Sequence, residues 1–215
     1  MIVSIDGLSL TGKSDLSKMV AKELGCKSFD TGNLYRCIAY ELNKENINMN
    51  DNKAVVKAVK NMKVDLEEDR VLINSVDVTS KINSDPNLFL LASQCAANPD
   101  VKDMVERYQR KFARENDAVI EGRDIGEKVV PNADIKFYFY SDFRKRVNRM
   151  NNLLGEGDGV SVFKNIPENI KAIDDIDINS GNFYKPTNAV EIDTTDLSNN
   201  EILNIMMDEI NKLKD

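Results

Sequence analysis

The sequence predicts an α/β protein whose core is a parallel sheet of about five strands flanked by helices. Short apolar runs rich in β-branched or aromatic residues recur along its 215 residues. Helical patterns separate most of these runs, as expected for buried parallel strands joined by crossover helices. A glycine-bearing loop, Gly7 to Ser14, stands directly between the first run and the first helical pattern. The chain length favours one domain with inserted subdomains.

The expected strands cover residues 2–5, 27–29, 118–120, 134–140 and 189–192. A first helix is expected over residues 13–24, because its apolar residues recur at three- and four-residue spacing and Gly25 follows. A hairpin is expected over residues 70–78, with Asn74 and Ser75 at its turn. A charged helix is expected over residues 99–114. Residues 153–162, rich in glycine and acid between two polar helical segments, predict a mobile lid.

Composition and charge limit the classes of function. With 41% hydrophobic and 30% charged residues, the chain is expected to be a soluble globular protein. The net charge of −7 argues against broad binding to nucleic acid or anionic membrane. The first apolar run is too short for a membrane span and lacks the basic flank of a signal peptide, so we expect a cytoplasmic protein.

Residue types that are missing exclude further chemistry. The sequence contains no histidine, which excludes imidazole catalysis and histidine-ligated metals. Its three cysteines, Cys26, Cys37 and Cys95, have no CxxC spacing and are expected to be reduced thiols.

The loop from Gly7 to Ser14 fits the pattern G-x-x-x-x-G-K-[ST] in its proper context, after a strand and before a helix. Its backbone amides and the positive end of the helix dipole would hold phosphate oxygens. Lys13 would reach the β- and γ-phosphates, and the Ser14 hydroxyl would be a magnesium ligand. The alternative is a glycine-bearing turn that matches by chance. The residues assigned to the phosphates are Gly7, Leu8, Ser9, Leu10, Thr11, Gly12, Lys13 and Ser14.

Two arginines follow predicted strands and indicate an acceptor for the phosphoryl group. Arg36 lies in DTGNLYR, residues 30–36, and Arg123 lies in EGRDIG, residues 121–126. The carboxyl ends of parallel strands are where open α/β sheets bind ligands, so the two arginines predict a phosphate clamp. The alternative for either one alone is a solvated surface charge. Neither an NKxD motif nor a strand ending in a DE-type Walker B pair is found, and the short chain favours a small-molecule kinase.

At these motifs the sequence resembles the bacterial cytidylate (CMP/dCMP) kinases, a family of nucleoside monophosphate kinases. The resemblance covers nearly the whole chain, including IDGLSLTGKS, FDTGNLYR, RVLINSVDVTSKI, VIEGRDIGEKVVPNADIKFYF and NAVEIDTTDLS. It implies transfer of phosphate from ATP to CMP or dCMP, with magnesium as cofactor and nucleotides as the partners. It also implies a P-loop kinase core over residues 1–33, 116–145 and 176–215, a monophosphate-binding insert with a small antiparallel sheet over 34–115, and a helical lid over 146–175. We expect a single domain and a monomer.

The resemblance assigns roles residue by residue. Arg36 and Arg123 would hold the acceptor phosphate and, with Lys13, supply the catalytic positive charge. Ser93 and Asp124 would read the cytosine edge, and Asp177 would bond the sugar. The other residues assigned to the acceptor are Thr31 and Lys102, and the lid residues assigned to ATP are Arg146 and Arg149. For the last two, a solvated helix face is the alternative.

Several positions depart from the family pattern. Lys102 stands where an arginine usually reads cytosine, Asn83 replaces an arginine, and Leu8 replaces a proline. In AIDDIDINS, Ile173 and Ser180 replace two arginines of the pattern R-D-x-x-D-x-x-R. These departures leave two alternatives open, a kinase for another small acceptor and a nucleotide-binding protein with little catalysis. The interpretation favoured here is weak CMP kinase activity.

Overall fold

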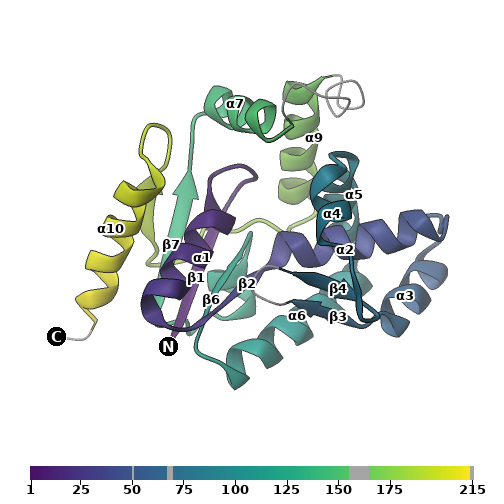
Figure 1. Cartoon of the computed structure of the whole chain (residues 1–215), viewed down its shortest axis with the longest axis horizontal. Helices are drawn as coiled ribbons and strands as arrows, with labels where there is room; N and C mark the ends of the chain where they lie inside the picture. The colour runs from purple at the N-terminus through teal and green to yellow at the C-terminus, as the bar shows by residue number, and fades with distance from the viewer. Residues whose placement is uncertain (50, 67–69, 155–164, 214–215) are drawn as a thin grey trace. The chain divides into compact units, whose positions relative to one another are not determined.

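The computed structural model describes residues 1–49, 51–66, 70–154 and 165–213. The chain forms two compact units, and Figure 1 labels most of their elements. We call residues 1–30, 109–146 and 183–215 the core unit, and residues 31–108 and 147–182 the insert unit.

A five-stranded sheet is the centre of the core unit, with the strand order β2-β6-β1-β7-β8. Every neighbouring pair is parallel. The strands are β1 (Ile2–Gly7), β2 (Lys27–Asp30), β6 (Ala118–Gly122), β7 (Ile135–Tyr140) and β8 (Val190–Asp193). These strands confirm the predicted α/β class and its parallel sheet.

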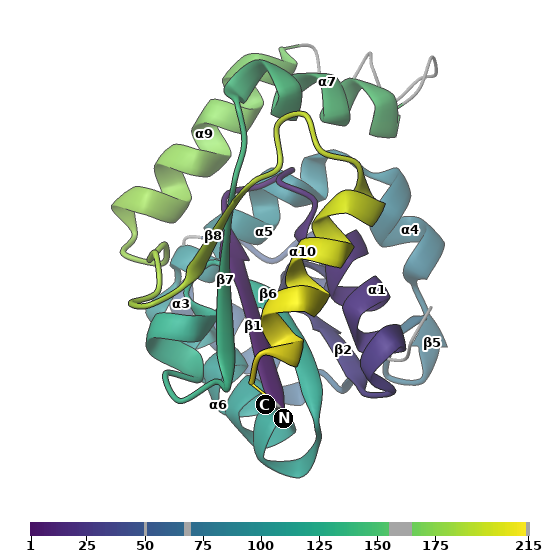
Figure 2. The ribbon, with the colours of Figure 1, turned by 90° about the vertical axis from the view of Figure 1, so that its left-hand side faces the viewer.

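Helices α1 (Lys13–Leu24) and α10 (Asn199–Asn211) pack side by side on one face of this sheet, as Figure 2 shows. Helix α1 ends at Gly25, whose left-handed φ of 65° fits the predicted stop. Helix α10 begins with a capping box of Ser198 and Glu201. Apolar residues of both helices and of the strands form one buried cluster, which includes Leu16 and Phe137. Burial of this cluster holds the helices against the sheet.

The insert unit contains a small antiparallel sheet with the order β3-β4-β5, formed by β3 (Val64–Leu66), β4 (Val71–Ile73) and β5 (Val76–Asp77). Asn74 and Ser75 connect β4 and β5 with positive φ values of 50° and 67°, as a two-residue hairpin turn of the primed type requires. The predicted hairpin is therefore confirmed.

The insert unit also contains several helices, and two further helices have residues in both units. Within the unit lie α2 (Thr31–Lys44), α3 (Asn52–Asn61), α4 (Thr79–Ser84), α5 (Asn87–Ala97) and α9 (Ile166–Asn179). Helices α6 (Pro99–Glu115) and α7 (Phe143–Leu154) belong partly to each unit. Helix α5 packs against both α2 and α9. The predicted lid stretch is described only at residues 153 and 154, and its residues 155–162 lie outside the described residues.

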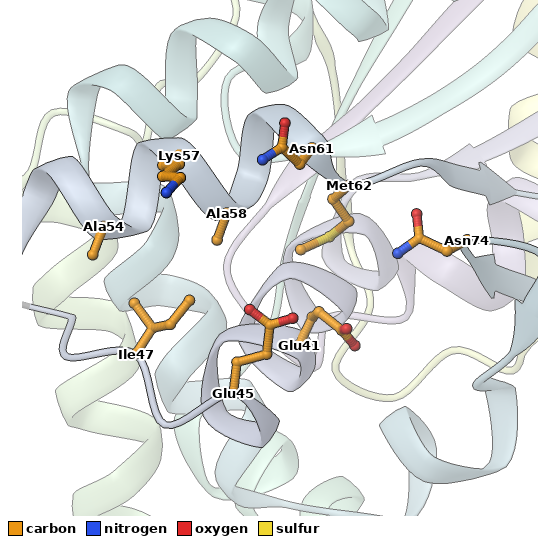
Figure 3. Close-up of a pocket in the computed structure, with 9 residues that line it drawn as sticks. All are labelled: Glu41, Glu45, Ile47, Ala54, Lys57, Ala58, Asn61, Met62 and Asn74. Carbon is orange, nitrogen blue, oxygen red and sulfur yellow. The ribbon is translucent and has the colours of Figure 1, made fainter.

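A cavity of about 330 Å³ lies in the insert unit between the end of α2, α3 and the turn after β4 (Figure 3). Its lining mixes the acidic Glu41 and Glu45 with Lys57 and with apolar groups such as Met62. None of its lining residues was assigned to ligand binding from the sequence.

The three cysteines are free thiols, as predicted. Over the described ranges, no helix combines the length and apolar character that a membrane span needs.

Candidate active site

The loop from Gly7 to Ser14 leaves the end of β1 and enters the first turn of α1. Leu10 and Gly12 have positive φ values of 62° and 92°, which bend the backbone tightly. The Thr11 hydroxyl donates to the Leu8 carbonyl at 2.9 Å, and the Thr194 hydroxyl donates to the Thr11 carbonyl at 2.9 Å. The loop is therefore fixed by its own side chains and by the segment that follows β8.

Lys13 is buried within this loop, with only 5% of its surface exposed. Its ammonium donates to the Leu8 carbonyl at 2.7 Å and to the Thr11 hydroxyl at 3.4 Å. Burial, and next the positive charge of Arg123, lower the pKa of Lys13 to about 7. An anionic ligand in the loop would favour the charged ammonium and offer it stronger partners than a carbonyl. The Lys13 ammonium therefore lies against the loop that the sequence predicts to hold phosphate.

Glu121 is a functional candidate that the sequence analysis missed. It lies in β6 beside β1, is buried, and accepts a hydrogen bond from the Ser14 hydroxyl at 3.3 Å. Burial and the neighbouring carboxylate of Asp30 raise the pKa of Glu121 well above its usual range. A DE-type pair consists of two residues adjacent in sequence, whereas the acidic neighbour of Glu121 is Asp30 of β2, which pairs directly with β6.

Asp6 organises the turn that carries Arg123 and Asp124. Its carboxylate accepts hydrogen bonds from the backbone amides of Ile125 at 2.7 Å and Gly126 at 2.8 Å. Burial raises the pKa of Asp6 to about 7, although these two hydrogen bonds act in the opposite direction. Asp124 is also buried, and the Arg123 carbonyl accepts from the Tyr184 amide at 2.9 Å. The backbone of this turn is thus held on two sides.

Arg146 is a cation of the core unit, like Lys13 and Arg123, and it contacts the loop. Its guanidinium donates to the Ser9 carbonyl at 3.4 Å and lies 5.4 Å from the centre of the Phe143 ring. Only 5% of Arg146 is exposed, so the alternative of a solvated helix face is wrong for this residue. Arg149, one turn further along α7, is partly buried, and burial lowers its pKa.

Arg36 lies in the second turn of α2, beyond the strand end that carries its motif. One guanidinium nitrogen donates to the Asn33 side chain at 2.5 Å, and the guanidinium lies 4.8 Å from the centre of the Phe89 ring. Its Nε atom is buried and has no hydrogen-bond partner among the residues that the structure describes. A buried donor of this kind suits an anionic ligand that satisfies it.

The other predicted acceptor residues also belong to the insert unit. Thr31, Ser93 and Asp177 are buried, with 7%, 7% and 4% of their surfaces exposed. Lys102 forms an ion pair with Glu106 one turn along α6 at 3.3 Å. The structure thus brings the loop residues, Glu121, Arg123, Asp124 and Arg146 together in the core unit, and it places Thr31, Arg36, Ser93, Lys102, Arg149 and Asp177 in the insert unit.

The matching family model and the curated relatives agree on one family. A family model described as cytidylate kinase matches residues 3–212. A cytidylate kinase of Fusobacterium nucleatum subsp. nucleatum is 33% identical over 100% of this chain and 99% of its own length. A cytidylate kinase of Caldanaerobacter subterraneus subsp. tengcongensis is 32% identical over 98% of this chain and 94% of its own. The solved structure of an uncharacterized protein from Eubacterium ventriosum is similar in fold, with a TM-score of 0.52 and 14% identity over 99% of this chain and 98% of that one.

Proposed function

Because the chain belongs to the cytidylate kinase family, we infer that it transfers the γ-phosphoryl group of ATP to CMP. The observation that carries this function is the loop between β1 and α1, whose buried Lys13 ammonium points onto the loop's own backbone. That geometry is suited to binding a polyphosphate. No observation favours the alternatives of another acceptor or of binding without catalysis.

The reaction needs alignment and positive charge more than covalent help from the protein. A phosphate oxygen of CMP bonds to the γ-phosphorus while the bond from that phosphorus to the β,γ-bridging oxygen breaks, and CDP and ADP leave. Within the core unit, we assign Lys13 and Arg146 to the phosphates of ATP, because both are buried and both donate to carbonyls of the loop. Arg123 is assigned to the acceptor phosphate and to the transferred group, because its charge acts on Lys13 from the adjacent strand end.

We also propose that magnesium binds beside the loop. The residues that would hold it are Ser14, through its hydroxyl, and Glu121 and Asp30, through carboxylates, which are oxygen donors that Mg²⁺ prefers. These side chains fit the ion, since Ser14 and Glu121 are hydrogen-bonded at 3.3 Å and the two carboxylates interact. In the described part of the chain, no group of three or more histidine, cysteine or acidic side chains could hold a metal. When bound, magnesium would neutralise charge on the phosphates.

For the acceptor, we propose the residues that the family pattern assigns in the insert unit. Arg36 would bind the CMP phosphate, because its buried Nε atom has no hydrogen-bond partner among the described residues. Ser93 would bond the cytosine edge and Asp177 the sugar, and both are buried polar groups suited to a ligand. Thr31 and Lys102 would complete the acceptor contacts, with Lys102 leaving its ion pair with Glu106 to reach the base. Asp124, of the core unit, would also bond the base, and Arg149 would contribute to ATP. The same residues would accept dCMP.

A coupled assay with ATP and a panel of nucleoside monophosphates tests this function. We expect transfer to CMP and dCMP, and a different acceptor or binding without turnover would contradict it. The variant Arg123→Ala should raise the KM for CMP and lower kcat together, because its charge is needed in both the ground and transition states. Arg114→Ala, which removes an exposed arginine of α6, is the control and should change neither constant. Unchanged constants in Arg123→Ala would show that Arg123 is only structural.

A further inference from the structure

The start of α7 decides where Arg146 lies. The Arg146 amide donates to the Asp142 carbonyl at 3.1 Å, and its guanidinium reaches the Ser9 carbonyl of the loop. The Asp142 carboxylate accepts from the amides of Arg144 at 2.8 Å and Lys145 at 3.4 Å, which caps the helix. A shift of Asp142 would therefore move the first turn of α7, and Arg146 with it.

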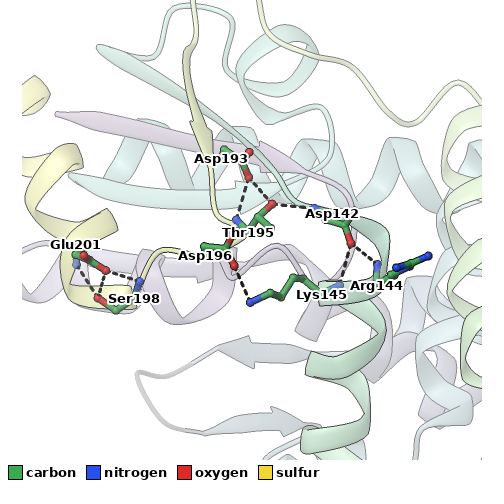
Figure 4. Close-up of polar contacts among 8 residues, drawn as sticks. All are labelled: Asp142, Arg144, Lys145, Asp193, Thr195, Asp196, Ser198 and Glu201. Carbon is green, nitrogen blue, oxygen red and sulfur yellow. Dashed lines mark hydrogen bonds and ion pairs between the residues drawn. The ribbon is translucent and has the colours of Figure 1, made fainter.

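Asp142 is itself held by the segment that follows β8 (Figure 4). Its amide donates to the Thr195 hydroxyl at 2.9 Å. That hydroxyl donates to the Asp193 carboxylate at 2.5 Å, and the Thr195 amide donates to the same oxygen at 2.9 Å. A carboxylate only accepts, so the Thr195 proton points to Asp193 and a lone pair remains for the Asp142 amide. An ion pair of Lys145 with Asp196 at 2.8 Å joins the same two segments.

The same segment also supports the phosphate loop. Thr194, directly before Thr195, donates to the Thr11 carbonyl through its hydroxyl and to the Tyr140 carbonyl through its amide, each at 2.9 Å. One short stretch therefore holds the loop through Thr194 and the start of α7 through Thr195. The loop and the helix start that carries Arg146 therefore share one contact segment.

We propose that Thr195 is a positioning residue for phosphoryl transfer, which acts through Asp142 to hold the Arg146 guanidinium against the phosphate loop. This inference rests on the proposed function of Arg146 as a ligand of the ATP phosphates. Hydrogen bonds from Thr195 hold the Asp193 pKa below its usual value, so Asp193 stays an acceptor at neutral pH. Because Arg146 is assigned to the ATP phosphates, the loss of the Thr195 contact should appear as a lower kcat/KM for ATP.

The test compares Thr195→Val, which keeps the shape and loses the hydroxyl, with Thr195→Ser, which keeps the hydroxyl. We expect Thr195→Val to lower kcat/KM for ATP about three- to tenfold, as the loss of one positioning hydrogen bond would. Thr195→Ser should restore the wild-type value. The matched control is Ser198→Ala, because the Ser198 hydroxyl also caps a helix start in this region but serves α10. It should leave kcat/KM for ATP unchanged.

A double-mutant cycle with Arg146→Ala separates positioning from a general structural effect. If Thr195 acts through Arg146, Thr195→Val should have no further effect on kcat/KM for ATP in the Arg146→Ala background. An equal loss in both backgrounds, an equal loss in Ser198→Ala, or unchanged kinetics in Thr195→Val would overturn the proposal. If Thr195→Val does not fold, Thr195→Ala enters the same cycle. Transfer to an acceptor other than CMP in the wild-type protein would contradict the proposed function and leave this cycle interpretable.

Discussion

The variant Gly7→Ala tests whether close packing between β1 and β7 fixes the position of the backbone where the phosphate loop begins. A Cβ atom at this position would lie 2.3 Å from the Phe139 carbonyl oxygen and 3.2 Å from the Thr11 hydroxyl oxygen. Carbon–oxygen contacts are normally about 3.3–3.6 Å, so Gly7→Ala must move the backbone by about 1 Å. The φ of 154° at Gly7 adds strain for any residue with a side chain.

The magnitude follows from these two terms. Overpacking costs about 1–3 kcal/mol and an unfavourable backbone conformation about 1–3 kcal/mol, so Gly7→Ala should lower the free energy of unfolding by about 2–6 kcal/mol. Gly25→Ala is the matched control, because Gly25 also has a positive φ, of 65°, but a Cβ there meets nothing within 4 Å. It should lose only the conformational term, about 1 kcal/mol.

Urea unfolding measures the loss of unfolding free energy in both variants. Steady-state kinetics below the unfolding temperature measures the KM for ATP, which reports on the phosphate loop. Because the displaced atoms belong to Phe139 of β7 and Thr11 of the loop, Gly7→Ala should also raise the KM for ATP, while Gly25→Ala should not. Equal losses of unfolding free energy in the two variants would refute the argument from close packing. A destabilised Gly7→Ala with an unchanged KM for ATP would show that the displacement goes into β7 and spares the loop.

Three further predictions concern the site and its support. Lys13→Met should lower kcat by at least about a hundredfold and leave the melting temperature near that of the wild type, since an apolar chain of similar length replaces a buried cation. Activity retained by the folded variant would contradict the assignment of Lys13 to the ATP phosphates. Because the pKa of Asp6 is raised in the folded state, Asp6 contributes stability that is complete below about pH 4 and is lost as the pH rises through about 7. Between those pH values, the free energy of unfolding of the wild type should fall by up to about 4 kcal/mol relative to that of Asp6→Asn. Urea unfolding from pH 4 to 8 checks this, and a constant difference would contradict it. Ser180→Arg, at an exposed position directly after α9, should fold normally and raise kcat/KM for CMP about tenfold. Ile173→Arg should instead destabilise the protein, because Ile173 is 2% exposed. No gain in Ser180→Arg would show that this end of α9 does not contact the acceptor phosphate.

Local sequence patterns were sufficient to predict the fold class, the strands of the parallel sheet, the hairpin and helices α1 and α6. The loop after β1 and the helix that ends at Gly25 follow from glycine placement and apolar spacing within about twenty residues. The turn at Asn74 and Ser75 follows from the backbone conformations that these residues tolerate. Each signal concerns neighbours along the chain, which is why no tertiary information was needed.

The candidate site was predicted where a motif names its own residues. Lys13 and Arg123 belong to such motifs, and the structure places both in the core unit with their charges acting on each other. Their catalytic roles remain predictions. The burial of Arg146 could not be predicted, because its position in a charged helical segment is equally consistent with a solvated surface.

The sequence by itself therefore determined the phosphate loop, the parallel sheet and the hairpin, because short-range periodicity and turn chemistry encode them. Only the tertiary structure decided that Glu121 meets Ser14, 107 residues away along the chain. It also decided that Thr195 holds Asp142 across 53 residues. Both contacts depend on the order in which the strands pair, and that order is fixed by packing of the whole sheet, which no local pattern records.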